Sequence, residues 1–412
     1  MSILMLISAF KFQNYRRFYA GTAISNAGNW THRLAQDWLV LQLTGSATAL
    51  GIVVAAQFIP GIFFGVYGGV LADKFDQRKV LLGCYGAGAI LASALGAFVY
   101  LDLVTYGIVV VAAFLLGIAT AIEGPVRQSY YVMLVGDEHL PNALSWNQVN
   151  LYFGRLVGPL TSGVLIETIG MAPSFFFNGF TYLLAVLAIV AINVNNYELA
   201  TTKAQPGESE TLVSALRYLR TNKEVLLAIS IVSFAAMMGQ DMQVTSALMA
   251  SQEFKGNAAS LGLLGSLAAA GAIVGSVAFT RKKFALDLTF MSRRVIYVSM
   301  VWYLASLAPT YATYAIALFL VGYFAMGVNI SGNMSIRVFV DARFYGKVWG
   351  IYIALWLTAI AMGGPILGLI SENFSIRAAI ASGAIASAAV ALLTLTALKL
   401  GLIQRSGVNS RK

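Results

Sequence analysis

The chain has 412 residues, of which 58% are hydrophobic and only 11% are charged. This is too little charge to cover the surface of a water-soluble protein of that size, so the composition excludes a soluble globular protein and indicates a membrane protein. The net charge of +10 would also suit nucleic-acid binding, but the distribution of the charges along the chain indicates a membrane instead.

Apolar stretches of about 18 to 25 residues recur along nearly the whole chain, and each is long enough to cross a hydrocarbon layer of roughly 30 Å as a helix. They predict twelve transmembrane helices. The expected spans are Phe18–Leu43, Ser46–Leu71, Val80–Leu101, Thr105–Leu134, Asn142–Ile166, Ala172–Val194, Val225–Ala250, Ala258–Thr280, Val295–Ala308, Tyr311–Val340, Val348–Ile370 and Ala378–Leu400.

Basic residues mark one side of this arrangement. Of the 27 Lys and Arg residues, 23 lie at the two termini or in loops that alternate spans would place on one side. Only Lys255 and Arg377 lie on the other side, and Arg33 and Arg155 lie within spans. The positive-inside rule therefore predicts a multi-pass protein of the bacterial inner membrane with both termini in the cytoplasm.

A single long polar segment, 195–224, divides the chain near its middle. Its second part, from about Glu208, has the apolar spacing of a helix that lies on the cytoplasmic surface. We therefore expect a six-helix bundle in residues 1–194, a cytoplasmic linker with a surface helix in 195–224, a second six-helix bundle in 225–402 and a cytoplasmic tail in 403–412.

The two halves also resemble each other. The stretch from Thr44, "TGSATALGIVVAAQFIPGIF", is similar to the stretch from Lys255, and the Gly-Pro pair at Pro159 is repeated at Pro365, an offset of 206 residues. This repeat predicts an all-α membrane protein with twelve helices in two pseudo-symmetric halves around a central cavity, which is a transporter architecture.

The loop after the second span carries the most specific motif, "GGVLADKFDQRKVLL". It resembles the loop signature of the major facilitator superfamily at Gly69, Leu71, Ala72, Asp73, Arg78 and Lys79, whereas Asp76 and Gln77 replace its second glycine and an arginine. The form with Asp is similar to the drug/proton antiporter branch that includes macrolide and siderophore exporters.

The fifth span contains "GRLVGPLTSG", which is similar to the antiporter motif of the same family through Gly154, Gly158, Pro159 and Gly163. These small residues form a flat face against which another helix can rock, or simply a tight helix contact. The fourth span lacks the arginine-glycine motif that other proton antiporters carry near its start.

Glu123 and Arg127 in "EGPVRQ" are one helical turn apart and therefore lie on the same helix face. The family resemblance implies that this pair joins Gly69, Asp73 and the basic loop residues in a cytoplasmic gating cluster, which holds the outward-facing state closed. A plain surface ion pair is the alternative.

Charged residues within the spans are the candidates for proton coupling, because such groups are costly in lipid and usually face a cavity. Arg33 and Asp37 are four residues apart on one helix stripe, so the arginine is expected to keep Asp37 ionised. Asp241 has no basic residue on its own helix face and is the better proton carrier, unless Arg155, the third cavity charge, pairs with it. His32 is expected to be a polar lining residue.

Amide and indole side chains near these charges are expected to line a cavity for an amphipathic organic molecule. About half of them are expected to form interhelical hydrogen bonds instead. The expected cavity residues are Trp30, Gln36, Gln240, Gln243, Asn147, Asn150, Asn329, Asn333 and Trp356.

These observations predict an exporter that exchanges small amphipathic, drug-like or siderophore-like compounds for protons by alternating access. An importer or uniporter of the same fold is the main alternative, and a transport-inactive sensor is a third. We expect no enzyme activity, cofactor, metal or nucleic-acid partner, because the chain has two histidines, one cysteine (Cys84) and no phosphate-binding loop. We expect a monomer in the bilayer.

Overall fold

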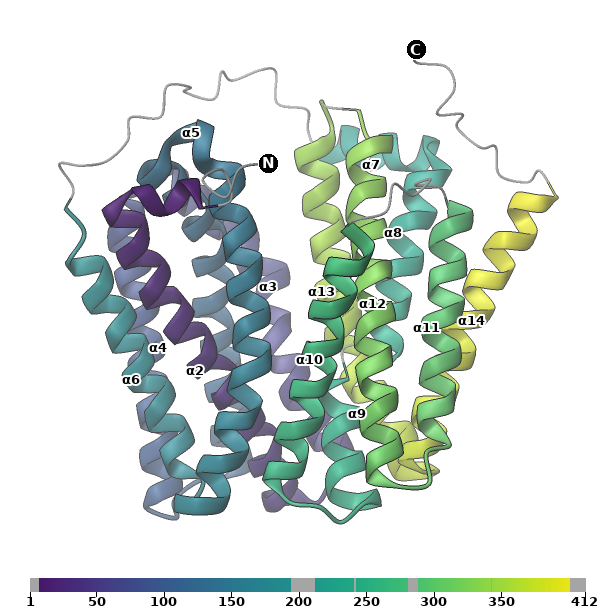
Figure 1. The fold of residues 1–412 in the computed structure, drawn as a ribbon, viewed down its shortest axis with the longest axis horizontal. Coiled ribbons are helices and arrows are strands. Elements are labelled where there is room, and N and C mark those ends of the chain that lie inside the picture. Colours follow the sequence, from purple (N-terminus) through teal and green to yellow (C-terminus); the bar gives the residue numbers. More distant parts are fainter. Residues whose placement is uncertain (1–6, 194–211, 241, 281–287, 342, 401–412) are drawn as a thin grey trace. The chain divides into compact units, whose positions relative to one another are not determined.

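The computed structural model describes residues 7–193, 212–240, 242–280, 288–341 and 343–400 (Figure 1). Within these ranges the regular secondary structure is helical, without strands. The helices are η1 (Ser8–Lys11), α2 (Gln13–Thr44), α3 (Ala47–Lys74), α4 (Gln77–Tyr100), α5 (Tyr106–Ile169), α6 (Ala172–Val190), α7 (Leu212–Thr221), α8 (Lys223–Ala235), η3 (Ala236–Gln240), α9 (Gln243–Leu248), η4 (Met249–Glu253), α10 (Ala258–Thr280), α11 (Leu288–Ser306), α12 (Tyr311–Phe339), α13 (Tyr345–Asn373) and α14 (Ile376–Lys399).

Helix contacts group the chain into two units. The first unit comprises the described residues of 1–207 and 250–266, and the second comprises those of 208–249 and 267–412. The first nine residues of α10 therefore belong to the first unit and the rest of this helix to the second.

Local sequence signals place the helix ends. Ser46, Asp76 and Ser375 cap helices α3, α4 and α14, because their side-chain oxygens accept hydrogen bonds from backbone N–H groups of the first turn. Helix α2 ends at Thr44, and the next residue, Gly45, has a φ of 63°, in the left-handed region that glycine adopts readily. Gly136, with a φ of 70°, interrupts α5, which thus consists of two helices, 106–135 and 137–169.

In the first unit, α2 packs against both α5 and α6, and α4 packs against the same two helices. Their shared core is rich in aromatic side chains. Tyr15 and Phe18 of α2 are fully buried against Tyr130 and Tyr131 of α5, with ring centroids 5.1 to 5.8 Å apart. Such ring contacts fix the relative position of α2 and α5, the two helices that carry most polar residues of the unit.

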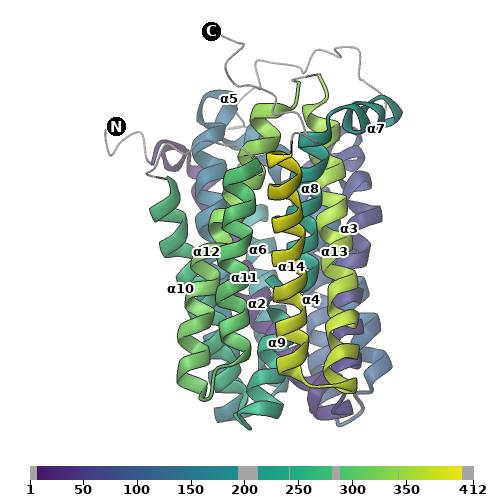
Figure 2. The same cartoon turned by 90° about the vertical axis from the view of Figure 1, so that its right-hand side faces the viewer.

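In the second unit, α11 packs against α12 and α14, and the views in Figures 1 and 2 show α11 and α14 side by side. Aliphatic residues of α8, α11 and α13, such as Ile229, Val295 and Val348, form its core. Helix α13 packs against η3 as well.

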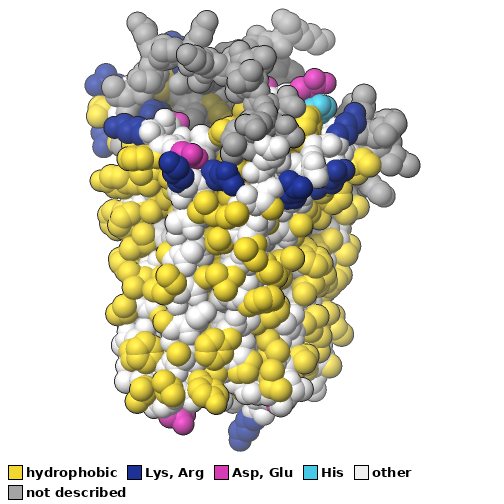
Figure 3. Space-filling view, turned by 90° about the vertical axis from the view of Figure 1, so that its left-hand side faces the viewer, with side chains coloured by type: hydrophobic (Ala, Val, Ile, Leu, Met, Phe, Trp, Pro, Cys, Tyr) yellow, Lys and Arg dark blue, Asp and Glu magenta, His cyan; other side chains and the backbone are white. Residues whose placement is uncertain are grey.

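One outer face of the molecule is apolar over a broad band. On the face drawn in Figure 3, hydrophobic side chains cover the middle, and Lys and Arg side chains gather toward one end. Nine helical segments among the described residues are long and apolar enough to cross a membrane, and α5, counted once, contains two helices. The total of twelve spans stays a prediction that agrees with these segments.

Two of the expected spans differ in the structure. The seventh, Val225–Ala250, is not one α-helix, because α8 ends at Ala235 and the π-helical turn η3 and the short α9 follow. The ninth begins at Leu288, earlier than expected, and thereby includes Arg294. The guanidinium of Arg294 lies 4.4 Å from the ring centre of Phe279 and 4.8 Å from that of Phe290, and such contacts help to hold a charge next to apolar surface.

Candidate functional site

An ion pair lies inside the first unit. Nε of Arg127 is 3.2 Å from Oε1 of Glu123, and both side chains are only 14% exposed. The hydroxyl of Tyr85, on α4, donates a hydrogen bond of 2.6 Å to the same carboxylate oxygen. The spacing of four residues on α5 brings the two charges together, and α4 supplies the third group.

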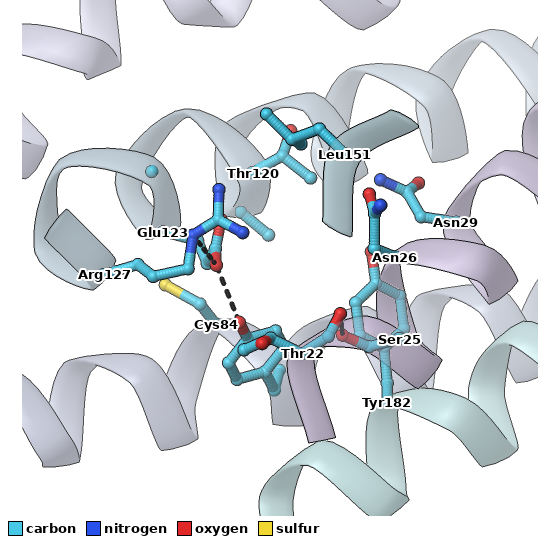
Figure 4. Close-up of a pocket in the computed structure, with 13 residues that line it drawn as sticks. Thr22, Ser25, Asn26, Asn29, Cys84, Thr120, Glu123, Arg127, Leu151 and Tyr182 are labelled. Carbon is cyan, nitrogen blue, oxygen red and sulfur yellow. Dashed lines mark hydrogen bonds and ion pairs between the residues drawn. The ribbon is translucent and has the colours of Figure 1, made fainter. Parts of the chain in front are cut away.

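This ion pair borders a polar pocket of about 200 Å³, shown in Figure 4. Helices α2, α4, both parts of α5, and α6 contribute its walls, and the amides of Asn26 and Asn29 lie across the pocket from the ion pair. The lining residues are Thr22, Ser25, Asn26, Asn29, Cys84, Tyr85, Ala119, Thr120, Glu123, Gly124, Arg127, Leu151 and Tyr182.

The pocket lies at the level of the helix centres. Asn29 is near the middle of α2, Tyr182 near the middle of α6 and Leu151 near the middle of 137–169. Glu123 lies about 18 Å before the end of helix 106–135, at about 1.5 Å per residue. The ion pair is therefore well inside its helix and not at the helix end.

The loop residues of the predicted gating cluster lie elsewhere. Asp73 is exposed near the end of α3, and the described residues show no ion pair between it and Glu123 or Arg127. Arg78 donates a hydrogen bond of 2.8 Å to the carbonyl of Val190, the last residue of α6. The backbone N–H of Lys79 donates to the capping carboxylate of Asp76. In the glycine pair before this loop, an added Cβ at Gly69 would meet nothing within 4 Å. The gating role stays a prediction.

Trp30 of α2 is bracketed by two of the charges expected in the cavity. The guanidinium carbon of Arg155 lies 4.6 Å from the Trp30 ring centre, and that of Arg33 lies 5.3 Å from it and 5.2 Å from the ring centre of Phe58. Asp37 is buried, with 3% exposure. Both guanidinium groups thus lie next to aromatic rings, and this cation–π attraction offsets part of the free-energy cost of placing a charge away from water.

A second, smaller cavity of about 20 Å³ lies on the same side of α2. Both ring nitrogens of His32 and the amide nitrogen of Gln36 are buried without a hydrogen-bond partner among the described residues. The ring of His32 packs edge-on against Phe175. Asn29 and Thr120 line both this cavity and the larger pocket, so the two are neighbours along α2.

The predicted antiporter motif forms close helix contacts. A Cβ at Gly158 would lie 2.8 Å from the carbonyl oxygen of Ala27, and a Cβ at Gly154 would lie 3.0 Å from Cδ1 of Trp30, both on α2. On another side of the motif, a Cβ at Gly163 would lie 2.8 Å from Cα of Ala259, at the start of α10.

Pro159 belongs to the same contacts, because its carbonyl approaches Gly262 of α10. The hydroxyl of Thr31 donates to the Gly158 carbonyl at 3.1 Å, and that of Ser266 donates to the Leu156 carbonyl at 2.6 Å. The motif residues thus pack between α2 and the beginning of α10.

Two of the expected cavity amides form interhelical hydrogen bonds. Tyr131 donates to the side chain of Asn147 at 3.1 Å, and Asn26 donates to the side-chain oxygen of Asn150 at 3.4 Å. Of the residues expected in the cavity, Gln36 alone lines one of the two cavities described above.

The remaining expected residues belong to the second unit. Gln243, Asn329 and Trp356 are half-buried, and Asn333 is exposed. Asp241 and the side chain of Gln240 lie outside the described residues.

Most polar residues that line the pocket were not predicted from the sequence, although the spacing of polar residues in α2 indicates a polar helix face. Its polar residues are spaced by three or four positions or are adjacent, which places them along one helix face. The members of this stripe are Thr22, Ser25, Asn26, Asn29, His32, Arg33 and Gln36. Tyr85, Thr120 and Tyr182 have no such signal, because each is a single polar residue in an apolar helix.

Comparison with known proteins identifies the family. Residues 6–411 match the profile of a family described as transmembrane secretion effector. The staphyloferrin A transporter of Staphylococcus aureus is 19% identical over 362 residues, covering 87% of this chain and 90% of that protein. Macrolide efflux protein A of Streptococcus pyogenes is 21% identical over 275 residues, covering 65% and 67%.

A crystal structure of the nucleoside transporter NupG has the same fold. It superposes with a TM-score of 0.71 at 14% identity, over 94% of this chain and 99% of that one. At this identity the likeness speaks for the fold alone.

Proposed function

Because the chain belongs to the transmembrane secretion effector family of the major facilitator superfamily, we propose that it exports small amphipathic compounds in exchange for protons by alternating access. Multi-pass membrane transport of a small molecule is common to its efflux-type relatives. For this chain we propose, in addition, exchange with protons, transport in the outward direction and an amphipathic substrate.

The observation that carries this proposal is the polar pocket beside Glu123 and Arg127. A charged pair, four amide or hydroxyl side chains of α2 and the Tyr85 hydroxyl surround about 200 Å³ of space at the level of the helix centres. Polar groups at such depth are costly, and in membrane proteins they usually mark a substrate or ion pathway. A protein that only needed to pack its helices would fill this space with apolar side chains.

We further propose that Asp241 loads the coupling proton and that Asp37, beside Arg33, acts as a charged latch. Asp37 is buried on the helix that carries the polar stripe, which supports a role in the transport cycle. Asp73 and its loop are proposed to control switching between states and not substrate affinity. We also propose that the chain is a monomer in the bacterial inner membrane, with both termini in the cytoplasm.

Efflux of dyes from proteoliposomes with an imposed pH gradient tests this function. Liposomes with the purified full chain should move a panel of amphipathic dyes against their concentration gradient, and a protonophore should stop this movement. Liposomes prepared in the same way without protein provide the baseline. Because the chain can insert in both orientations, an impermeant inhibitor or orientation-specific digestion is needed to assign the direction.

The outcomes separate the alternatives. Movement only down a gradient, without response to the pH gradient, would indicate a uniporter. Proton-driven movement in the same direction as the protons would indicate an importer. No flux for the whole panel under any gradient would favour a sensor and contradict the proposal.

A further inference from the structure

The ion pair in the pocket leaves polar atoms of both partners available. Oε1 of Glu123 accepts a hydrogen bond from the Tyr85 hydroxyl and lies 3.2 Å from Nε of Arg127, at ion-pair distance but without hydrogen-bond geometry. No other hydrogen bond reaches the second carboxylate oxygen or the two terminal nitrogens of Arg127 in the described part of the chain. Both side chains keep 14% exposure, so these atoms are not sealed by protein. The pocket therefore offers a carboxylate oxygen and a guanidinium edge to a ligand.

The charges of the pocket select the kind of ligand. Among its thirteen lining residues, Glu123 and Arg127 are the only ones that carry a formal charge at neutral pH, so the lining is neutral as a whole. A ligand with a net charge would bring an uncompensated charge into a site of low dielectric constant. A zwitterion brings none, and each of its charges finds an opposite partner.

We infer that this pocket binds the zwitterionic head group of the transported molecule, with an ammonium group at Glu123 and a carboxylate at Arg127. This inference rests on the proposed transport of amphipathic compounds and adds the chemistry of their polar end. Arg127 suits the carboxylate, because a guanidinium edge can donate two parallel hydrogen bonds to it. Tyr85 positions Glu123 from α4 and leaves its second oxygen for the ammonium group.

The size of the pocket agrees with a head group and not with a whole drug-sized molecule. Its volume of about 200 Å³ is smaller than the roughly 300 to 1,000 Å³ of pockets that enclose drug-sized ligands. It equals the liquid volume of about seven water molecules, which is enough for an amino and a carboxyl group with their shared carbon. Asn26 and Asn29, across the pocket from the ion pair, can hydrogen-bond to the same group.

The chain carries a natural reporter for this pocket. Cys84 is its only cysteine, it lines the pocket, and it is partly exposed. The rate at which N-ethylmaleimide modifies the purified full chain therefore measures access to the pocket without any engineered cysteine. Mass spectrometry of the intact protein gives this rate.

Three probes of nearly the same shape separate the charge types. Leucine is a zwitterion, isocaproate is the matching anion without the amino group, and isoamylamine is the matching cation without the carboxyl group. At about ten times its Kd, leucine should slow the labelling of Cys84 about tenfold, because the rate follows the fraction of empty sites. Isocaproate and isoamylamine at equal concentration should leave the rate nearly unchanged.

Variants place the effect at the ion pair. Glu123→Gln and Arg127→Gln should each remove the protection by leucine, whereas Arg343→Gln should not, although it breaks the exposed Asp341–Arg343 ion pair in the same way. Thermal unfolding identifies variants that do not fold. If both pocket variants fail to fold, equilibrium dialysis of radiolabelled leucine, with the two matched ions as competitors, decides on the natural chain.

Several results would overturn the inference: equal protection by all three probes, protection by only one of the ions, or undiminished protection by leucine in a folded Arg127→Gln variant. No protection and no dialysis signal at any soluble concentration of leucine would mean a pocket that holds only water. Because these measurements use no gradient, their failure leaves proton-driven export standing. Loss of gradient-driven flux with intact leucine binding would contradict only the proposed function.

Discussion

Replacement of Gly158 by alanine should push α2 and α5 apart. A Cβ at this position would lie 2.8 Å from the carbonyl oxygen of Ala27 and 2.9 Å from the backbone nitrogen of Thr31. Ordinary van der Waals contact begins at 3.4 Å, and 3.4 minus 2.8 is 0.6, so the backbones of the two helices must move apart by at least 0.6 Å at this point. Both atoms belong to the backbone of α2, which cannot turn away as a flexible side chain could. Such overpacking typically costs about 1 to 3 kcal/mol of stability.

The control is a glycine in an open position. An added Cβ at Gly86 of α4 would meet nothing within 4 Å, so Gly86→Ala should leave stability unchanged or raise it by up to about 1 kcal/mol, because alanine favours the helix. Thermal unfolding of both variants, in the same detergent as the natural chain, measures the difference. If Gly158→Ala unfolds at the same temperature as Gly86→Ala, the helix contact is looser than described and the antiporter-like motif has no packing role.

Three further changes test other parts of the site. His32→Leu should keep stability or raise it by about 1 to 3 kcal/mol in thermal unfolding, because neither ring nitrogen has a partner at good hydrogen-bond geometry in the described chain. A clear loss would mean that the neighbouring Gln36 side chain, or a water in the 20 Å³ cavity, bonds to the ring. Tyr85→Phe should cost about 1.5 to 3 kcal/mol in the same assay, because it removes a hydrogen bond to the charged Glu123, and unchanged stability would refute the described bond. In proteoliposomes, Asp241→Asn should abolish gradient-driven uphill transport but permit downhill exchange, whereas Asp37→Asn should impair both. If the Asp241→Asn variant still transports uphill at the native proton stoichiometry, Asp241 is not the proton carrier and this role would be assigned to Asp37.

Most helices could be predicted because lipid imposes a simple length rule. A run of apolar residues long enough to cross the membrane must satisfy its backbone as a helix, so α3, α10 and α14 begin and end within a few residues of the expected spans. The two spans around Gly136 were separated correctly as well, because Asp137, Glu138 and Pro141 interrupt the apolar pattern there.

The length rule does not predict where the backbone of a span leaves the regular α-helix. Residues 236–240 and 242–253 include polar residues such as Gln240, Gln243 and Gln252, and they form two π-helical turns and the short α9, with a φ of 44° at Met242. Hydropathy reports the polarity of side chains and not the hydrogen-bond register of the backbone, so the polar residues of this segment did not predict the π-helical turns. π-Helical turns are frequent at functional sites, and this segment surrounds Asp241.

The site was predicted in part, because charges are visible in a sequence and their partners are not. Glu123 and Arg127 were paired correctly from their spacing of four residues. Their place in a pocket was missed, since Tyr85 and Tyr182 come from α4 and α6, and only the packing of these helices brings them to α5. The resemblance to a loop motif directed attention to Asp73 instead.

The polar stripe of α2 gives a physical reason for the charges within this helix. Its polar residues begin at Thr22 in the pocket and continue through Asn29, which borders both cavities, to Gln36 in the smaller one. Asp37 follows directly and is buried. A transmembrane helix can hold such a row only if it faces protein or a cavity, because lipid would leave each group without a partner. We therefore expect α2 to be the helix through which ligand binding in the pocket and the state of Asp37 influence each other.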